Sequence, residues 1–129
     1  GWAAGENQVN HSIQYGLTAW VTDLRMRDVG EIREIGFPVI CTGATPETFS
    51  QEVVGVNVPI YLAGAQVRGG DIIVADDDGA VVIPIEAFDR VMANVRDMAE
   101  KEAEQERLIK SKVPLDELVK FLATKGKAV

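Results

Sequence analysis

The hydrophobic pattern of the chain changes from short apolar runs to one long stretch in which apolar residues recur with helical periodicity. Up to Ile83, the apolar runs alternate with turns rich in Gly, Pro and Asp, a pattern typical of short strands and loops. After Pro84, apolar residues recur at helical spacing, which predicts a long amphipathic helix. The pattern as a whole predicts the α/β class, with a β-rich layer covered by helices.

Helices and strands are expected in alternation over the first third of the chain. Asn7 is a favourable N-cap for the first helix, and Gly16 and Gly36 are suitable stops for two helices. The expected ranges are 7 or 8 to 15 for the first helix, 17–21 for a strand, 28–35 for a short helix and 38–42 for a second strand.

The second part of the chain predicts a hairpin followed by helices. Asp77-Asp78-Gly79 is a strong hairpin turn between strands over 71–75 and 80–83, and 55–63 is a further strand-like stretch, in which Pro59 indicates an edge strand or a bulge. A long helix is expected from 84 to about 112, and a last short helix begins at Pro114. The apolar stripe of the long helix is expected to face a core and consists of Ile85, Phe88, Met92, Val95 and Ala99.

Composition narrows the class of protein. The 129 residues suit one domain, and a net charge of −7 argues against nucleic acid as the main partner. No apolar run is long enough for a membrane span. The lone Cys41, expected to be a small core residue, fits a reducing compartment, so a cytoplasmic protein is expected. Because the chain opens on Gly1 without Met, either its start was processed or it belongs to a longer polypeptide.

Two stretches carry candidate chemistry. Residues 21–28 hold two Asp and two Arg at the end of a strand, where Asp offers hard oxygen to Mg²⁺ and Arg a planar fork to a carboxylate. The alternative is a solvated turn with a local salt bridge. The start of the first helix would present backbone N–H groups to an anion, or would be an ordinary capped helix. His11, the only histidine, falls on the polar side of this helix.

Three segments resemble one family. Val-Thr-Asp-Leu-Arg-Met-Arg-Asp at 21–28 resembles its Val-Ile-Asp-Gly-x-x-Arg-Asp signature, and Gly-Phe-Pro-Val-Ile at 36–40 resembles its Gly-x-Pro-Val-Phe. Residues 67–84 resemble its Pro-Gly-Asp-x-Val-x-Ala-Asp-x-Asp-Gly-Val-Val-Val-Ile-Pro segment. The family is the RraA-like group, which holds class II 4-hydroxy-4-methyl-2-oxoglutarate (4-carboxy-4-hydroxy-2-oxoadipate) aldolases and regulators of ribonuclease E activity.

The resemblance implies a swivelling β/β/α domain over residues 1–129. It covers only the later part of the family domain, so the family's N-terminal strands and helices are expected to be missing from this chain. The family forms trimers, sometimes stacked as hexamers, and a homo-oligomer is therefore expected.

The resemblance also implies roles for individual residues. Leu24, where the family usually has Gly, and the bulky Trp20 depart from the family pattern and could alter the turn and the pocket. The implied substrate loop consists of Gly5, Glu6, Asn7 and Gln8. Arg27 and Asp23 are implied as catalytic residues, and Arg27 also binds the substrate. Asp28 is implied as a metal ligand, and Glu102 is expected to reach the metal of a neighbouring subunit.

The implied activity is a retro-aldol cleavage that needs Mg²⁺ or another divalent cation such as Mn²⁺. The substrate would be 4-hydroxy-4-methyl-2-oxoglutarate or a related small 2-oxo acid, which would yield pyruvate. Decarboxylation of oxaloacetate gives the same enolate, so one site could perform both reactions. Two alternatives stay open, a non-catalytic interaction module like the regulators of ribonuclease E, and an inactive member kept for assembly.

Overall fold

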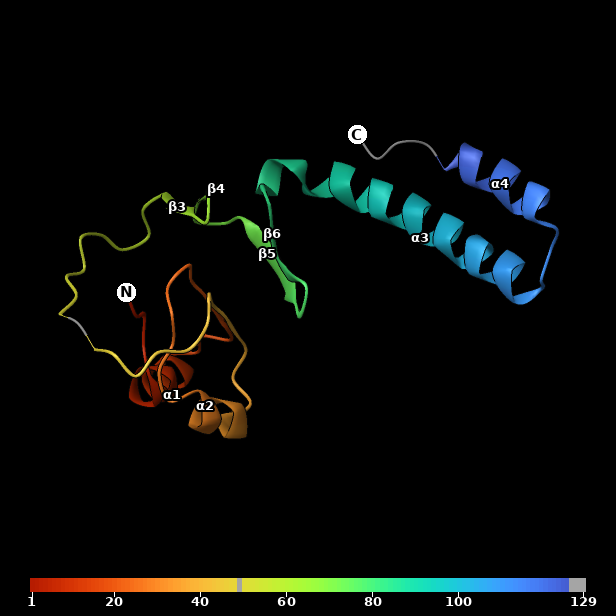
Figure 1. The fold of residues 1–129 in the computed structure, drawn as a ribbon. Helices are drawn as coiled ribbons and strands as arrows, with labels where there is room; N and C mark the ends of the chain where they lie inside the picture. Colours follow the sequence, from red (N-terminus) through yellow and green to blue (C-terminus); the bar gives the residue numbers. More distant parts are fainter. Residues whose placement is uncertain (49, 126–129) are drawn as a thin grey trace. The chain divides into compact units, whose positions relative to one another are not determined.

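The structure is a computed structural model that describes residues 1–48 and 50–125. The chain forms two compact units, Gly1–Ile85 and Glu86–Val129. Helices and strands both contribute to the fold (Figure 1), which confirms the predicted α/β class.

The first unit begins with two helices and a pair of parallel strands. These elements are α1 (Glu6–Gln14), β1 (Trp20–Val21), α2 (Val29–Ile35) and β2 (Val39–Ile40). The predicted strands are correct in place but shorter than expected. The backbone N–H of Trp20 donates to Pro38 O at 3.0 Å and that of Thr22 to Ile40 O at 2.9 Å, which fixes the parallel register.

The parallel pairing continues beyond these strands in extended segments. Isolated bridges join Trp2 to Arg25 and Met26 to Ala44, both in parallel orientation. The backbone N–H of Arg27 donates to Ala4 O at 2.9 Å, on the other side of the same segment. Three extended segments therefore run side by side: a first segment over residues 1–4, a central segment over 20–27 and a third segment over 39–45. Their carboxyl ends meet at one edge.

A small apolar core lies beneath these segments and both helices. Its buried members come from the first extended segment, α1, the central segment, α2 and the loop after α2, and they are Ala4, Val9, Met26, Ile32 and Phe37. Met26 is 1% exposed and Val9 is completely buried, so the central segment and α1 are fixed against each other. Burial of each large apolar side chain contributes about 1.5–3 kcal/mol.

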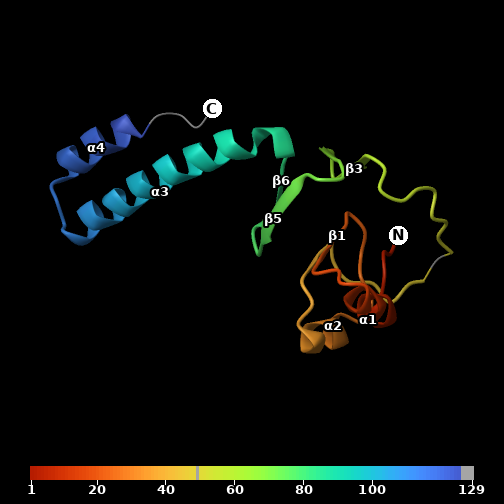
Figure 2. The same ribbon diagram turned by 180° about the vertical axis from the view of Figure 1, so that it is seen from behind.

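Two antiparallel hairpins complete the first unit (Figure 2). The second was predicted by its Asp-Asp-Gly turn, and its register pairs Asp76 with Gly79. The first includes a strand over residues 65–67 that the sequence pattern did not predict, because its turn, with Ala63 at φ 47° and Gly64 at φ 86°, carries no Asn-Gly or Asp-Gly signal. The strands are β3 (Ile60–Leu62), β4 (Ala65–Val67), β5 (Ile72–Asp76) and β6 (Gly79–Ile83).

The second unit is a helical hairpin. A short 3-10 turn, η1 (Ile85–Ala87), precedes α3 (Phe88–Lys110), and α4 (Leu115–Thr124) follows a turn with Lys112 at φ 53°. Both predicted helices are present, but the long one begins at Phe88 rather than at 84 and ends at Lys110 rather than at about 112, and the last one begins at Leu115, directly after Pro114. No helix among residues 1–48 and 50–125 is both long enough and apolar enough to cross a membrane.

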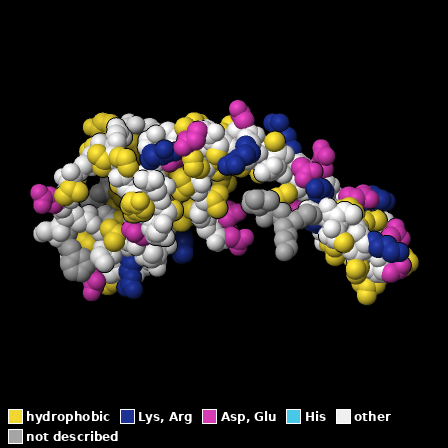
Figure 3. Space-filling view, turned by 90° about the horizontal axis from the view of Figure 1, so that it is seen from above, with side chains coloured by type: hydrophobic (Ala, Val, Ile, Leu, Met, Phe, Trp, Pro, Cys, Tyr) yellow, Lys and Arg dark blue, Asp and Glu magenta, His cyan; other side chains and the backbone are white. Residues whose placement is uncertain are grey.

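The predicted core-facing stripe of the long helix is wrong in part. Ile85 is 56% exposed, Phe88 36% and Val95 49%, whereas Leu108, outside the stripe, is buried. The physical reason is that α4 pairs with the later turns of α3. Hydrophobic side chains therefore reach the surface on both units (Figure 3).

Candidate functional site

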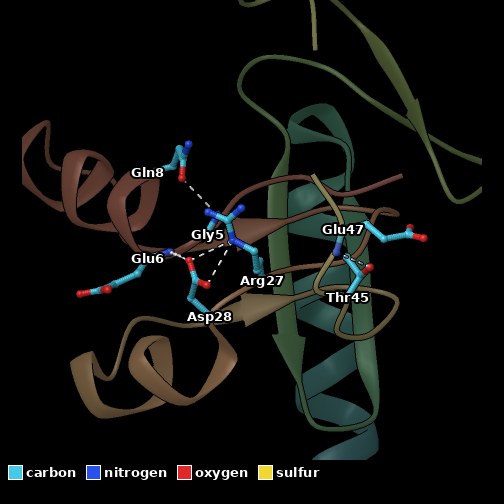
Figure 4. Close-up of polar contacts among 7 residues, drawn as sticks. All are labelled: Gly5, Glu6, Gln8, Arg27, Asp28, Thr45 and Glu47. Atoms are coloured by element: carbon cyan, nitrogen blue, oxygen red, sulfur yellow. Dashed lines mark hydrogen bonds and ion pairs between the residues drawn. The ribbon is translucent and has the colours of Figure 1, made fainter. Parts of the chain in front are cut away.

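The candidate site lies at the carboxyl ends of the three parallel segments (Figure 4). Gly5 follows the first segment, Arg27 and Asp28 follow the second, and Thr45 ends the third. In open α/β sheets, ligands bind outside the carboxyl ends of parallel strands. A shallow depression of about 350 Å³ opens there, lined by Met26, Arg27, Asp28, Val29, Ala44, Thr45 and Pro46.

Arg27 and Asp28 form an ion pair that uses only one edge of the guanidinium. Arg27 Nε lies 3.2 Å from Asp28 Oδ1 and 3.3 Å from Oδ2, and each side chain is about one-third exposed, 33% and 32%. Within the described part of the chain, no oxygen accepts a hydrogen bond from the two terminal Nη atoms of Arg27. This leaves the planar fork available for a bidentate contact with a carboxylate.

Asp28 also caps the first helix. The backbone N–H of Glu6 donates to Asp28 Oδ2 at 3.1 Å, and that of Gly5 donates to Gln8 Oε1 at 3.1 Å. The N-cap of α1 is Gly5 rather than the predicted Asn7, which lies inside the helix. Because Gly5 has no side chain, a carboxylate from another segment performs the capping instead.

Gly5 is the residue that permits this close approach. It is buried, and a Cβ atom there would overlap Asp28 Oδ2 and lie 3.4 Å from Arg27 Nη2. The φ of Gly5 is −131°, which any residue adopts, so space and not backbone conformation requires glycine. The helix start and the ion pair are therefore in direct contact.

Asp28 has an unusual backbone conformation. Its φ of 57° and ψ of 41° lie in the left-handed region, and its side chain makes no capping bond to α2. Aspartate tolerates this region better than most residues, and such positions cluster at functional sites. Asp28 is the N-cap residue of α2 by position, but its carboxylate does not cap that helix and is directed toward α1 and Arg27.

Most of the residues expected at the site are brought together, and three are not. Gly5, Glu6 and Gln8 contact one another or the Arg27–Asp28 pair through the hydrogen bonds at the start of α1, although the side chain of Glu6 points away in Figure 4. Asn7 is exposed on α1 and lines a shallow depression together with His11.

Asp23 lies in different surroundings. Its Oδ2 accepts a hydrogen bond from the backbone N–H of Ala63 at 3.3 Å. It lines a mostly apolar pocket of about 320 Å³ together with residues of β1, β2 and the two hairpins, and with Cys41, which directly follows β2. The structure therefore does not bring Asp23 to the Arg27–Asp28 pair. Glu102 is exposed on α3, in the second unit.

Two residues near the pair were not singled out in the sequence. The Trp2 ring lies with its centroid 5.3 Å from Arg27 Cζ. Thr45 is 6% exposed, and its Oγ1 accepts a hydrogen bond from the backbone N–H of Glu47 at 3.2 Å. The Thr-Pro dipeptide marks a turn, but no spacing pattern points to Trp2, which meets Arg27 only through parallel pairing.

The donor set at the site fits a highly hydrated cation. Among the described residues, no group of three or more His, Cys, Asp or Glu side chains could hold a metal ion. Mg²⁺ retains several waters and is commonly bound through one or two carboxylates plus substrate oxygens. Asp28, which is partly exposed and lines the depression, provides one such carboxylate.

Residues 1–82 match the RraA-like family described as Aldolase/RraA, and the chain belongs to this family. A Halalkalibacterium halodurans protein provisionally named 4-hydroxy-4-methyl-2-oxoglutarate aldolase is 31% identical over 111 residues, which are 85% of this chain and 53% of the relative. The 4-hydroxy-4-methyl-2-oxoglutarate aldolase of Thermus thermophilus is 31% identical over 81 residues, 62% of this chain and 49% of the enzyme.

Solved structures agree with this assignment. The crystal structure of Streptomyces coelicolor RraAS2, an unusual member of the RNase ES inhibitor RraA protein family, is 35% identical with a TM-score of 0.72, over 84% of this chain and 55% of that one. An uncharacterized Pseudomonas syringae protein shares the fold, with a TM-score of 0.73 over 90% of this chain and 59% of that one, at 21% identity. The chain spans about half the length of the two aldolase-named relatives.

Proposed function

We propose that this chain contributes the active site of a divalent-metal-dependent aldolase that cleaves 4-hydroxy-4-methyl-2-oxoglutarate or a related 2-oxo acid to pyruvate. The observation that supports it best is the Arg27–Asp28 pair at the start of α1, with the terminal nitrogens of Arg27 unbonded to the described residues. The aldolase names of its relatives favour the same activity.

Arg27 is assigned the binding of the substrate carboxylate or the adjacent keto oxygen. Its fork can donate two parallel hydrogen bonds to an oxyanion, and charge-assisted bonds of this kind are the strong ones. The positive end of the α1 dipole lies beside it, because Asp28 and Arg27 both approach Gly5. The backbone N–H groups of Gly5 and Glu6 already donate to Gln8 and Asp28, so the donors that the start of α1 can add for the same end of the substrate are the backbone N–H groups of Asn7 and Gln8.

Asp28 is assigned two tasks. It holds Arg27 through Nε, and it offers an oxygen to hydrated Mg²⁺ or Mn²⁺. A bound divalent cation supplies Lewis-acid stabilisation of developing negative charge. In retro-aldol cleavage the substrate hydroxyl loses its proton to water and becomes a carbonyl, while the electron pair of the broken carbon–carbon bond passes to the other fragment. Arg27 therefore faces increasing negative charge as the enolate of that fragment forms, and protonation of the enolate yields pyruvate. Oxaloacetate decarboxylation develops charge at the same place, and we propose it as a second activity.

The assembly and location are part of the same proposal. We propose a homo-oligomer, trimer or hexamer, in which Glu102 of one copy lies near the metal site of another. Glu102 is exposed and lies on α3, so it is available for such a contact. We propose a cytoplasmic location, consistent with the single cysteine of the chain.

The decisive variant is Asp28→Asn. The amide oxygen can still accept the hydrogen bond from Glu6, and Asn ranks with Asp as a cap, so folding is preserved. The negative charge that attracts the cation is lost. We expect Mg²⁺-dependent release of pyruvate from 4-hydroxy-4-methyl-2-oxoglutarate to fall by about 100-fold or more, the scale of a lost charged contact in the transition state.

Two further variants make this test specific. Asp77→Asn changes the same group in the β5–β6 turn, away from the site, and should behave as the parent. Asp23→Asn distinguishes a role of Asp23 from a role of Asp28, because Asp23 lines the apolar pocket and not the depression beside Arg27. Full activity of Asp28→Asn with an unchanged Mg²⁺ requirement would refute the metal role. A loss confined to Asp23→Asn would place the reaction at the other pocket.

The likeness to RraAS2 favours a second candidate, binding to an RNase E-type enzyme without catalysis. In that case the parent protein would release no pyruvate from either 2-oxo acid but would slow RNA cleavage by the ribonuclease. Running both assays on one preparation distinguishes the two functions.

A further inference from the structure

We propose that Trp2 is a positioning residue that holds the Arg27 fork in the orientation needed to bind a carboxylate. This inference rests on the proposed function, since it concerns the same oxyanion contact. The Trp2 ring centroid lies 5.3 Å from Arg27 Cζ, within the range of a cation–π contact. Both residues are half-buried, which strengthens the contact relative to a fully hydrated one.

Arg27 is restrained on two sides. Asp28 accepts from Nε at 3.2 Å, which fixes one edge of the guanidinium plane. Trp2 lies against the group and limits its remaining rotation about the side-chain bonds. The edge that carries the terminal nitrogens then faces the start of α1, where Nη2 lies 3.4 Å from the position a Cβ of Gly5 would occupy.

The backbone holds Trp2 in place for this task. Ala3 N–H donates to Arg25 O at 2.7 Å, and Arg25 N–H donates to Gly1 O at 3.3 Å. These two bonds flank Trp2 and set its position on the segment next to the one that carries Arg27. Its position is therefore fixed by parallel pairing and not by a flexible loop.

The expected consequence is pre-organisation. A free Arg side chain loses rotamer freedom when it binds a ligand, and a stacked one has lost part of it on folding. The same contact is made before and after the substrate binds, so Trp2 should favour substrate and transition state to a similar extent. Its removal is expected to raise KM and the Kd of a substrate analogue with little change in kcat.

The test compares Trp2→Leu, Trp2→Phe and Trp20→Phe in the presence of Mg²⁺, with oxalate as the probe of binding. Trp2→Leu keeps apolar bulk but removes the π face, and should weaken oxalate binding about fivefold, with kcat unchanged within about twofold. Trp2→Phe restores an aromatic face and should recover most of the affinity. Trp20→Phe is the matched control, because the Trp20 ring N–H contacts Ser12 Oγ at 2.9 Å instead of Arg27.

A spectroscopic measurement supports the comparison. The chain has two tryptophans, so in Trp20→Phe the emission comes from Trp2 alone. Saturation with oxalate should change that emission, and the change should disappear in the additional variant Arg27→Lys, which cannot offer the same fork. This measurement decides the question even if Trp2→Leu does not fold.

The outcomes separate the two proposals. Oxalate affinity of a folded Trp2→Leu equal to that of Trp20→Phe would overturn the positioning role and leave the proposed function intact. Oxalate binding to Trp20→Phe without any change in Trp2 emission would do the same. A parent protein that neither binds oxalate nor releases pyruvate would refute the proposed function, and this inference with it.

Discussion

Two regions of the molecule, the surroundings of the Arg27–Asp28 pair and the helical hairpin of α3 and α4, contain the same types of charged residue but pair them differently. In the first, Asp28 contacts the backbone of Glu6 and the side chain of Arg27, so its partners come from two separate segments. In the second, ion pairs join residues three or four positions apart on one helix, such as Arg107 with Glu104. Charged side chains from distant segments converge in the candidate site, whereas charged side chains with local partners lie on a solvated helix surface.

Burial accounts for this difference. Around the ion pair, five buried hydrophobic residues fix two helices and an extended segment relative to one another. In the helical hairpin, Leu108 is the one buried hydrophobic side chain among the described residues. A packed core can hold a charged pair in one geometry, whereas exposed pairs on a helix contribute only about 0.3–0.5 kcal/mol.

The largest effect is expected at Leu108, because this side chain is buried in the helical hairpin as the core residues are buried in the first unit. Leu108→Ala should reduce the free energy of unfolding of the helical hairpin by about 3 kcal/mol, the scale of a buried large-to-small change. Far-UV circular dichroism during urea titration measures it. Ile109→Ala is the control, since Ile109 is 51% exposed, and equal losses in the two variants would show that Leu108 is not the residue that joins α3 to α4.

A smaller effect is expected from Gly5→Ala. The added Cβ overlaps Asp28 Oδ2, so the carboxylate or the start of α1 must move, at a cost of about 2 kcal/mol in stability. Oxalate binding should weaken as well, because Arg27 loses its fixed partner. Thermal unfolding and an oxalate titration measure the two effects.

Gly30→Ala is the matched control for that prediction. A Cβ at Gly30 meets nothing within 4 Å, and the residue lies within α2, so the substitution should stabilise the protein by about 0.4–1 kcal/mol. If both alanine variants gave the same small change, the close approach at Gly5 would not constrain the site.

Local features of the fold were predictable from the sequence, and contacts between segments were not. Helical spacing predicted α3, and Asp-Asp-Gly predicted the β5–β6 hairpin, because both signals act within a few residues. The cap of α1 was misassigned to Asn7. The carboxylate that caps this helix belongs to Asp28, 22 positions along the chain from Glu6, whose N–H donates to it. Local propensity carries no information about a contact over that distance.

The site shows the same division. The resemblance predicted Arg27, Asp28 and the Gly5–Gln8 segment as site residues, and the structure places Gly5 and Glu6 of this segment against the pair, while their roles stay predictions. Trp2 was missed because its meeting with Arg27 depends on parallel pairing between segments 25 residues apart. The resemblance also implied Asp23 as a catalytic residue beside Arg27, but its Oδ2 accepts a hydrogen bond from the backbone N–H of Ala63, in the turn after β3.

The smallest effect is expected at the Glu104–Arg107 pair, which represents the local kind of contact. Hydrogen bonds from Arg107, followed by its positive charge, hold the pKa of Glu104 below its ordinary value of 4.5. A lowered pKa in the folded state means that the pair stabilises folding above about pH 4.5, and that this contribution is lost as the pH falls through the lower, folded value. Arg107→Gln should return the pKa of Glu104 toward 4.5, which an NMR titration measures. The thermal midpoint at neutral pH should stay unchanged within error, because the side chains of Glu104 and Arg107 are 39% and 64% exposed and an exposed pair contributes little. A marked fall in that midpoint would show that local ion pairs, and not only burial, stabilise the hairpin, and would weaken the contrast with the Arg27–Asp28 segment.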